Sequence, residues 1–287
     1  MAATRGRNPS RCSSAIVATT RRRRKATRVT TGRQQIQHTT YRNLAVVVKR
    51  WPGAPAEFFT AEATGLATLA GAGAMRVPRV LALEPERLVL EDLGEGTPKE
   101  KFWTLAGEGV AAQHALRNAR FGFKRDGFCG PTPQANPWTD DGWTFFAEHR
   151  LRPQARRALD GGHLAADDVD AVERICSRLH DLIPAQPASL LHGDLWLGNL
   201  HCCADGTPAL IDAGAVHFGW AESELAMLTL FGSPPDAFWR AYDSVAKPVS
   251  DWRERAPVYN LYHLLNHLNL FGVSYLGGVR DVLQRFG

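Results

Sequence analysis

The chain has 287 residues, 44% of them hydrophobic, and a formal net charge of +5. This length can bury one large core or two modest ones, and no apolar run approaches the roughly 20 residues that a membrane-spanning helix needs. The five cysteines are odd in number and form no C-x-x-C pair, which argues against a disulfide framework and a zinc site. Composition therefore predicts a soluble globular protein of the reducing cytoplasm.

The first 35 residues or so form a basic leader that differs from the rest of the chain. Residues 1–50 hold 13 of the 34 basic residues and none of the 29 acidic ones, so the remainder is net acidic. Large apolar side chains are almost missing from the leader, and we expect it to be disordered. A nucleic-acid-binding tail at Arg21–Lys25, an organelle transit peptide, and an artefact of a wrong start or shifted reading frame all remain open.

A strand and a helix follow the leader. The β-branched run Tyr41–Lys49 predicts a strand, and apolar spacing predicts a helix over Glu57–Ala70. Glu62 falls inside the apolar stripe of this helix, and a buried carboxylate needs a partner. Lys49 is the candidate partner, since a strand lysine paired with a helix glutamate holds phosphates in kinases. A surface lysine beside a half-exposed glutamate is the alternative.

Two further strands, Val77–Leu83 and Arg87–Leu90, end at Glu91–Gly94, which we interpret as a hinge. Beyond it the pattern becomes helical. Helices are predicted at Phe102–Leu116, Thr144–Leu159, Glu222–Phe231, Pro235–Tyr242 and Val258–Phe271. A further helix is predicted to begin at a cap formed by Asp167 or Asp168. The predicted fold class is α+β, with a leader (1–35), a small β-rich lobe (36–93) and a larger, mainly helical lobe (94–287).

The stretch Leu190–Asp212, LLHGDLWLGNLHCCADGTPALID, carries the clearest chemistry. The Asp-Gly turn within Ala204–Thr207 predicts a hairpin that returns Asp212 to the side of Asn199. Together with Asp194 these are hard oxygen ligands suited to Mg²⁺ and substrate phosphates.

The spacing between Asp194 and Asn199 matches the H-R-D-x-x-x-x-N loop of phosphoryl-transfer enzymes. In that loop the aspartate receives the proton of the substrate hydroxyl and the asparagine holds a metal. Here the loop begins His-Gly-Asp, so it is kinase-like without being that of a protein kinase. An ordinary turn would explain His-x-Asp alone, but not the same turn with Trp196, Gly198 and Asp212 in register.

With HGDLWLGN, the following Ile211-Asp212 and the run ESELAMLTLFG, the chain resembles the fructosamine kinase (ketosamine-3-kinase) family. That family belongs to the aminoglycoside phosphotransferase-like and choline kinase-like enzymes, which have a protein-kinase-like, two-lobed fold. The resemblance covers roughly residues 44–283, and the Asn136-Pro137-Trp138 loop and the LLNHLNLFG helix favour ketosamine kinases within the group.

The resemblance implies an ATP- and Mg²⁺-dependent kinase that phosphorylates the 3-hydroxyl of a ketosamine and so promotes deglycation. Asp194 would be catalytic, Asn199 and Asp212 would bind Mg²⁺, and His192 and Glu224 would brace the loop. The implied nucleotide-binding residues are Lys49, Glu62, Glu91 and Leu93, and the candidate acceptor residues are Trp138, Phe145, Trp196, His263, Asn266 and His267. For each acceptor candidate a purely structural role is the alternative.

Three departures from the family pattern qualify this expectation. Gly32 is the only glycine within reach of the position where the family carries a glycine-rich phosphate loop, so we expect impaired phosphate binding and a small lobe that lacks its first strands. Ala213 replaces the usual proline, and Glu224 replaces the usual aspartate. The alternatives are another small-molecule phosphotransferase of the wider group or a catalytically impaired nucleotide-binding relic.

Overall fold

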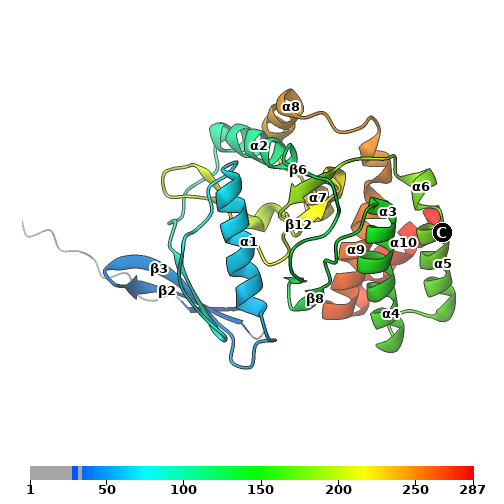
Figure 1. The fold of residues 1–287 in the computed structure, drawn as a ribbon, viewed down its shortest axis with the longest axis horizontal. Coiled ribbons are helices and arrows are strands. Elements are labelled where there is room, and N and C mark those ends of the chain that lie inside the picture. The colour runs from blue at the N-terminus through cyan, green and yellow to red at the C-terminus, as the bar shows by residue number, and fades with distance from the viewer. Residues whose placement is uncertain (1–27, 32–33) are drawn as a thin grey trace, which may run out of the picture.

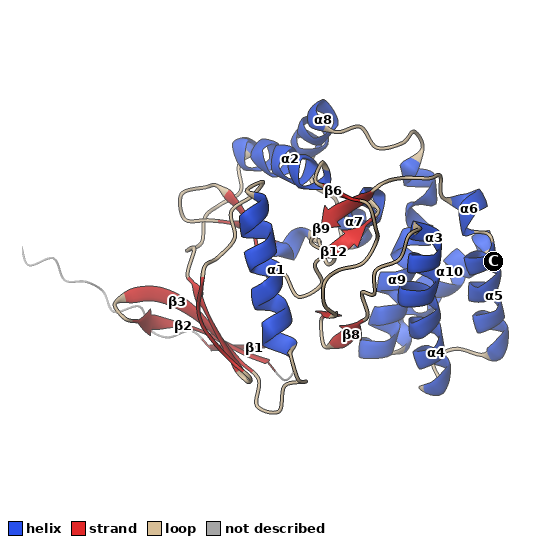
Figure 2. Cartoon of the chain, viewed as in Figure 1, coloured by secondary structure: helices blue, strands red, loops and turns tan. Residues whose placement is uncertain are grey.

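The computed structural model describes residues 28–31 and 34–287, which form two parts (Figure 1). A small antiparallel sheet and the long helix α1 (Phe58–Ala72) make up one part, and a larger, mainly helical part makes up the other. Figure 2 shows that the strands of the sheet gather at one end of the molecule and most helices at the opposite end. The helix α1 lies between them, so it can couple the sheet to the helical part.

The sheet of the small lobe contains five strands in the order β1-β2-β3-β5-β4. Successive side chains of β3 alternate between two faces, as in any strand, so Val46 and Val48 face one apolar cluster while Lys49 faces α1. The strands are β1 (Arg28–Thr31), β2 (Gln34–Tyr41), β3 (Leu44–Arg50), β4 (Val80–Glu84) and β5 (Arg87–Glu91).

Two expectations about the small lobe are wrong. The lobe does not lack its first strands, because β1 and β2 are present, and both begin inside the leader that composition predicted to be disordered. The cause is non-local, since β2 pairs with β3 along its length, from Gln35 opposite Arg50 to Tyr41 opposite Leu44. The other leader residues, including Cys12, Arg21–Lys25 and Gly32, lie outside the described residues.

The predicted strand Tyr41–Lys49 is in fact a hairpin. Tyr41 ends β2, and β3 begins at Leu44. Arg42 and Asn43 between them have φ of 49° and 64°, the left-handed pair that a two-residue hairpin turn requires. The helix α1 extends past the predicted Ala70 and ends before Gly73, which adopts the left-handed conformation. The N–H of Gly73 donates to the carbonyls of Leu69 and Ala70 and so closes the helix.

The helical part is built around α9 (Trp252–Phe271), which packs against α4, α7 and α10. One helical prediction needs correction, and one helix was missed. The helix at Ala166–Ser177 is capped by Ala165, and Asp168 lies in its first turn, where the carboxylate accepts the Ala165 N–H at 3.0 Å. The helix α10 was not predicted. The helices are α2 (Glu100–His114), α3 (Gly142–Phe146), a π-helical turn (Ala147–Leu151), α4 (Arg152–Asp160), α5 (Ala166–Ser177), α6 (Leu179–Leu182), α7 (Ala221–Leu230), α8 (Asp236–Val245) and α10 (Leu276–Phe286).

Short strands within the helical part hold the central loop. β9 (Ala188–Leu191) lies between β6 (Arg117–Asn118) and β12 (His217–Gly219), and β10 (Leu200–Cys202) pairs with β11 (Pro208–Leu210). A further hairpin joins β7 (Gly127–Cys129) to β8 (Thr132–Gln134).

Within the described part of the chain, no helix is both long and apolar enough to cross a membrane. The cysteines described there, Cys129, Cys176, Cys202 and Cys203, are free and buried.

Candidate active site

The catalytic loop, His192–Asn199, leaves β9 through a backbone turn that only glycine fits. Gly193 has φ of 85°, and a Cβ atom there would lie 2.1 Å from the carbonyl oxygen of Ala215. The loop closes when the side-chain amide of Asn199 donates to the carbonyl of Asp194 at 2.7 Å. The hairpin returns as the sequence predicted, since the N–H of Ile211 donates to the carbonyl of Asn199 at 3.2 Å. Asp212 therefore lies beside the loop.

Lys49 joins the small lobe to this loop. Its buried Nζ donates to Glu62 Oε1 at 2.5 Å and to Asp212 Oδ1. Burial alone would lower the pKa of Lys49, but the charges of Asp212 and Glu62 raise it well above its ordinary value. Burial would likewise raise the pKa of Asp212, yet the ammonium group holds it below its ordinary value. A lysine and two carboxylates from three distant segments therefore form one charged cluster.

Asp212 adopts a conformation that is unusual for a residue with a side chain. Its φ is 61°, in the left-handed region where aspartate and asparagine are the most tolerated residues after glycine. Such backbone conformations cost energy and gather at active sites, where the surrounding structure maintains them. The side chain of Asp212 remains 45% exposed, so its carboxylate can contact a ligand as well as Lys49.

Glu224 on α7 holds the start of the catalytic loop. Its carboxylate accepts the N–H groups of His192 at 3.1 Å and Gly193 at 2.6 Å, so the longer side chain reaches the loop. It also accepts from His114 Nε2 at 3.0 Å. Burial would raise the pKa of Glu224, but the hydrogen bond from His114 keeps it below its ordinary value. Sequence reasoning missed His114 and the adjacent Gln113, which donates to the same carboxylate at 3.4 Å.

His192 ties the loop to the end of β11. Its Nε2 donates to the carbonyl of Ile211 at 2.8 Å, one residue before Asp212. Its ring is fully buried and does not line a described cavity around Asp194. The contacts are those of a bracing residue.

An apolar cavity separates the small sheet from the β10–β11 hairpin, and Lys49 and Asp212 lie at one end of it. The carbonyl of Leu93 in the linker between the lobes accepts the N–H of Ala204 at 3.0 Å. The carboxylate of Glu91 is engaged by Arg79 at 3.1 Å and Arg76 at 3.3 Å. The carbonyl of Leu93 and the carboxylate of Glu91 are therefore both engaged within the protein, although both residues line the cavity. Its apolar walls are formed by Ile36, Val47, Pro78, Leu90, Leu93 and Ile211.

A second cavity, of about 350 Å³, opens on the other side of Asp194, and we call it the acceptor-side cavity. Exposed aromatic rings surround its mouth: Trp196 is 42% exposed, Phe231 44% and Phe271 64%. The ring of His267 packs against Phe231 at 4.9 Å and Tyr275 at 5.1 Å. Among the described residues that line the cavity, the ionisable groups near its floor are the carboxylate of Asp194, the imidazole of His267 and the thiol of Cys129. No lysine, arginine or glutamate lies in this described wall. This cavity therefore offers aromatic surfaces on which a ligand can stack, and few charged groups.

The acceptor candidates do not all reach this cavity. Trp196, Asn266 and His267 line it, although Asn266 is buried and donates to the backbone and thiol of Cys129 at 3.3 and 3.4 Å. His263 is buried beside Asp194. The structure places two candidates elsewhere: Trp138 packs against Phe218 on β12, and Phe145 lies in the core beneath the guanidinium of Arg150.

The Asn136-Pro137-Trp138 loop is held by Arg150, a buried residue of the π-helical turn. Its guanidinium donates to Asn136 Oδ1 at 2.7 Å and to the carbonyl of Ala135 at 2.8 Å. Asn136 is almost fully buried. The Asn136-Pro137-Trp138 loop therefore packs within the protein and does not line the acceptor-side cavity.

Asp194 lines the acceptor-side cavity and also a cavity that contains Lys49, Asn199 and Asp212, and its carboxyl group holds a proton more readily than an ordinary aspartate. Burial, together with the nearby carboxylates of Asp212 and Glu224, raises the pKa of Asp194 to about 6, against the opposing effect of His192. A carboxylate with a pKa near the working pH is a better general base than an ordinary aspartate. The structure therefore brings together a carboxylate of raised pKa, the charged cluster around Lys49, and cavities on both sides of Asp194.

Comparison with known proteins gives one consistent result. The fructosamine kinase family model matches residues 8–286. A probable ketoamine kinase of Synechocystis is 39% identical over 80% of this chain and 78% of its own length, and the probable ketoamine kinase YniA of Escherichia coli is 38% identical over 79% and 80%. A crystal structure assigned as a fructosamine-3-kinase from Thermobifida fusca has a TM-score of 0.84 at 34% identity, covering 91% of this chain and 92% of that one.

More distant structures bear on the fold alone. An aminoglycoside phosphotransferase crystallised with ADP and hygromycin B is 15% identical, with a TM-score of 0.61 over 91% of this chain and 94% of that one. The predicted α+β, protein-kinase-like fold with a small β-rich lobe and a larger helical lobe is confirmed.

Proposed function

Because the chain belongs to the fructosamine kinase family, we propose that it transfers the γ-phosphoryl group of ATP to the 3-hydroxyl of a ketosamine, the adduct formed when a sugar glycates an amine. The observation that carries the proposal is the arrangement around Asp194. A lysine with two carboxylates lies on the nucleotide side, and an aromatic cavity lies on the acceptor side.

The nucleotide occupies the apolar cavity between the sheet and the β10–β11 hairpin. Its base lies against Leu93 and Ile211, and its phosphates extend toward Lys49. Glu62 and Asp212 hold the lysine Nζ in place, so its position is fixed before ATP arrives. Preorganised charge of this kind stabilises phosphoryl transfer because no reorganisation is needed during the reaction.

Asn199 and Asp212 are the residues that would hold Mg²⁺. The amide nitrogen of Asn199 is committed to the carbonyl of Asp194, which leaves its side-chain oxygen available as a ligand. The carboxylate of Asp212 is partly exposed, and both residues line one cavity with Lys49 and Asp194. One carboxylate and one amide oxygen, completed by water and phosphate oxygens, fit the preference of Mg²⁺ for oxygen ligands. The bound ion would neutralise charge on the phosphates.

Asp194 receives the proton. The acceptor hydroxyl oxygen forms a bond to the γ-phosphorus, the bond from that phosphorus to the β,γ-bridging oxygen breaks, and ADP leaves with the bridging oxygen. The hydroxyl proton passes to the carboxylate of Asp194. Little further chemistry is required of the protein, because positioning and charge neutralisation supply most of the rate enhancement.

The acceptor lies in the acceptor-side cavity, with its sugar against Trp196 and its 3-hydroxyl toward Asp194. The amine of a ketosamine is cationic at neutral pH, and the exposed rings of Phe231 and Phe271 and the partly buried ring of Tyr275 offer negative π faces to it. Among the described residues, Asp194 is the only carboxylate that lines this cavity, so no second carboxylate there pairs with the amine. The catalytically impaired relic is less well supported, since β1 and β2, which the sequence predicted to be missing, are present, and β2 pairs with the strand that carries Lys49.

The direct test is turnover of fructoselysine with Mg-ATP, followed through ADP release and the phosphorus NMR signal of the product. Asp194→Asn should lower the rate by several orders of magnitude with an unchanged circular dichroism spectrum. The exposed Asp243→Asn on α8 serves as the matched control and should retain the wild-type rate. An undiminished rate in Asp194→Asn would rule out this assignment.

A further inference from the structure

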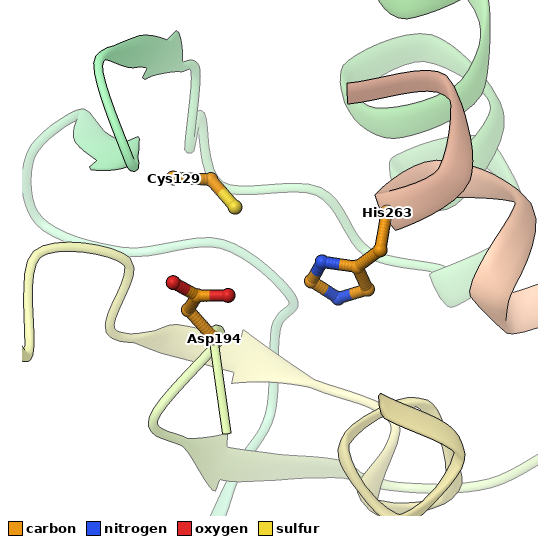
Figure 3. A group of neighbouring side chains, drawn as sticks. All are labelled: Cys129, Asp194 and His263. Carbon is orange, nitrogen blue, oxygen red and sulfur yellow. The ribbon is translucent and has the colours of Figure 1, made fainter. Parts of the chain in front are cut away.

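Three metal-ligating side chains from distant segments converge beside the acceptor-side cavity. They are Cys129 at the end of β7, Asp194 in the catalytic loop and His263 on α9. One ligand atom from each lies within 4.8 Å of the other two. Figure 3 shows the thiol, the carboxylate and the imidazole ring directed into one common space.

His263 carries a donor atom that the described protein leaves without a partner. The residue is only 6% exposed, and its Nδ1 is buried without a hydrogen bond from any described residue. An unmet buried polar atom costs on the order of 1–3 kcal/mol, so such an atom usually has a partner that the protein itself does not supply.

We propose that Cys129, Asp194 and His263 form an inhibitory binding site for Zn²⁺. Thiolate, imidazole and carboxylate are the three ligand types of zinc sites, and three protein ligands plus one water complete its tetrahedral shell. Zinc-to-ligand bonds of about 2.0–2.3 Å place ligand atoms some 3.3–3.8 Å apart, so the observed cluster needs to contract by about 1 Å. Small side-chain rotations at Cys129 and Asp194 achieve this.

The ion enters from the acceptor-side cavity, which Cys129 and Asp194 both line. Binding replaces the thiol proton of Cys129, which is released to solvent, by a zinc–sulfur bond, and no oxidant or reductant is involved. The thiolate and the carboxylate together balance the two positive charges of the ion. The occupied site is therefore neutral and does not repel the nearby guanidinium of Arg150. Mg²⁺ does not compete, because it prefers an all-oxygen shell.

Zinc at this site inhibits turnover because it occupies the carboxylate that must take the hydroxyl proton and blocks the floor of the acceptor-side cavity. Inhibition should therefore be competitive with the ketosamine and not with Mg-ATP. This inhibitory part rests on the proposed function. The binding part rests on the three side chains alone and is tested without turnover.

Binding is tested on the full chain with Co²⁺ as a spectroscopic probe for zinc. One equivalent of Co²⁺ should produce a thiolate-to-cobalt charge-transfer band that Zn²⁺ abolishes by displacement. Cys129→Ser should lose the band, and His263→Ala should weaken Zn²⁺ binding at least about 100-fold. Cys176→Ser, which removes a buried thiol on α5 that lies outside the site, should keep both.

Absence of the band in the wild type, its persistence in Cys129→Ser or its loss in Cys176→Ser would each overturn the site. X-ray absorption of the wild type with one equivalent of zinc tests the site without any variant. A zinc coordination shell that contains no sulfur would overturn the site, because Cys129 is one of its ligands. Zinc binding that leaves turnover of fructoselysine unchanged would overturn the inhibitory role. Absence of turnover in zinc-free buffer that contains excess Mg-ATP would instead count against the proposed function and leave the binding result standing.

Discussion

Gly65 of α1 lies so close to Ala213 that a Cβ atom at residue 65 would stand 1.8 Å from the carbonyl oxygen of Ala213. Ala213 directly follows Asp212, and Glu62 lies one helical turn before Gly65. The backbone contact therefore fixes the distance between the two carboxylates that hold Lys49. Because residue 65 has no side chain, this helix of the small lobe can pack directly against the backbone of a loop in the larger lobe.

Gly65→Ala should separate these elements. The added methyl group meets backbone rather than a mobile side chain, so α1 must move, at a cost of roughly 1–3 kcal/mol. We expect a lower melting temperature and a raised KM for ATP, because Glu62 withdraws from Lys49. Gly71→Ala in the same helix is the matched control, since among the described residues nothing outside the local helix backbone lies within 4 Å of its Cβ position. That change should be neutral or stabilise by about 0.5–1 kcal/mol. Equal behaviour of the two variants would contradict this role for the contact.

Lys49→Met should destabilise the protein in a pH-dependent way. Removing the ammonium group leaves two neighbouring carboxylates without their cation, which costs roughly 3–5 kcal/mol at neutral pH. Without Lys49 the folded-state pKa values of Glu62 and Asp212 rise. The loss of unfolding free energy relative to the wild type should therefore shrink as pH falls and the two carboxylates take up protons. Denaturant unfolding at pH 5 and pH 7.5 measures the difference. The exposed neighbour Arg50→Met should change stability little at either pH.

The raised pKa of Asp194 links activity and stability. The folded-state pKa of about 6 lies above the ordinary value near 3.9, so the wild type loses stability as pH rises from about 4 to about 6. Asp194→Asn does not titrate and should be more stable at pH 7 by up to about 3 kcal/mol, although it is inactive. The difference should vanish below about pH 4. For the wild type, kcat/KM should fall as pH drops through 6, because the free enzyme loses its base. A flat profile between pH 5 and 7 would contradict this pKa.

Local sequence signals located the charged cluster because each of its members follows a short-range rule. Helical spacing places Glu62 in the apolar stripe of α1, and the pairing of a strand lysine with a helix glutamate in kinases identifies Lys49 as its partner. The Asp-Gly turn returns Asp212 to the loop. None of these inferences needs a partner from a distant segment to be known in advance.

The features that were missed depend on distant partners. β2 is largely polar, and what makes it a strand is pairing with β3. His114 meets Glu224 across 110 positions, and Cys129 meets His263 only through the packing of β7 against α9, so spacing within the chain could reveal neither. The cysteine pattern argued against zinc for the same reason: it detects only ligands that are close in sequence.

Glu224 provides the clearest test of a positioning role. In Glu224→Gln, an amide N–H replaces one carboxylate oxygen and opposes the N–H of His192 or Gly193, leaving a buried donor unpaired. We expect the catalytic loop to shift and kcat to fall about 10- to 100-fold, with the KM for ATP nearly unchanged because the Lys49 cluster is not touched.

Glu222→Gln is its matched control, two residues earlier on the same helix. Glu222 is equally buried, but it accepts from Arg255 at 2.7 Å and from the hydroxyl of Tyr259 at 2.8 Å, away from the catalytic loop. Both variants should unfold at lower denaturant concentration, since each loses a charge-assisted buried hydrogen bond. Only Glu224→Gln should lose kcat per folded molecule, measured by calibrating active enzyme against the folded fraction. If both variants lost kcat to the same extent, the effect of Glu224 would be one of general stability, and its hydrogen bonds to the loop would have no separate part in catalysis.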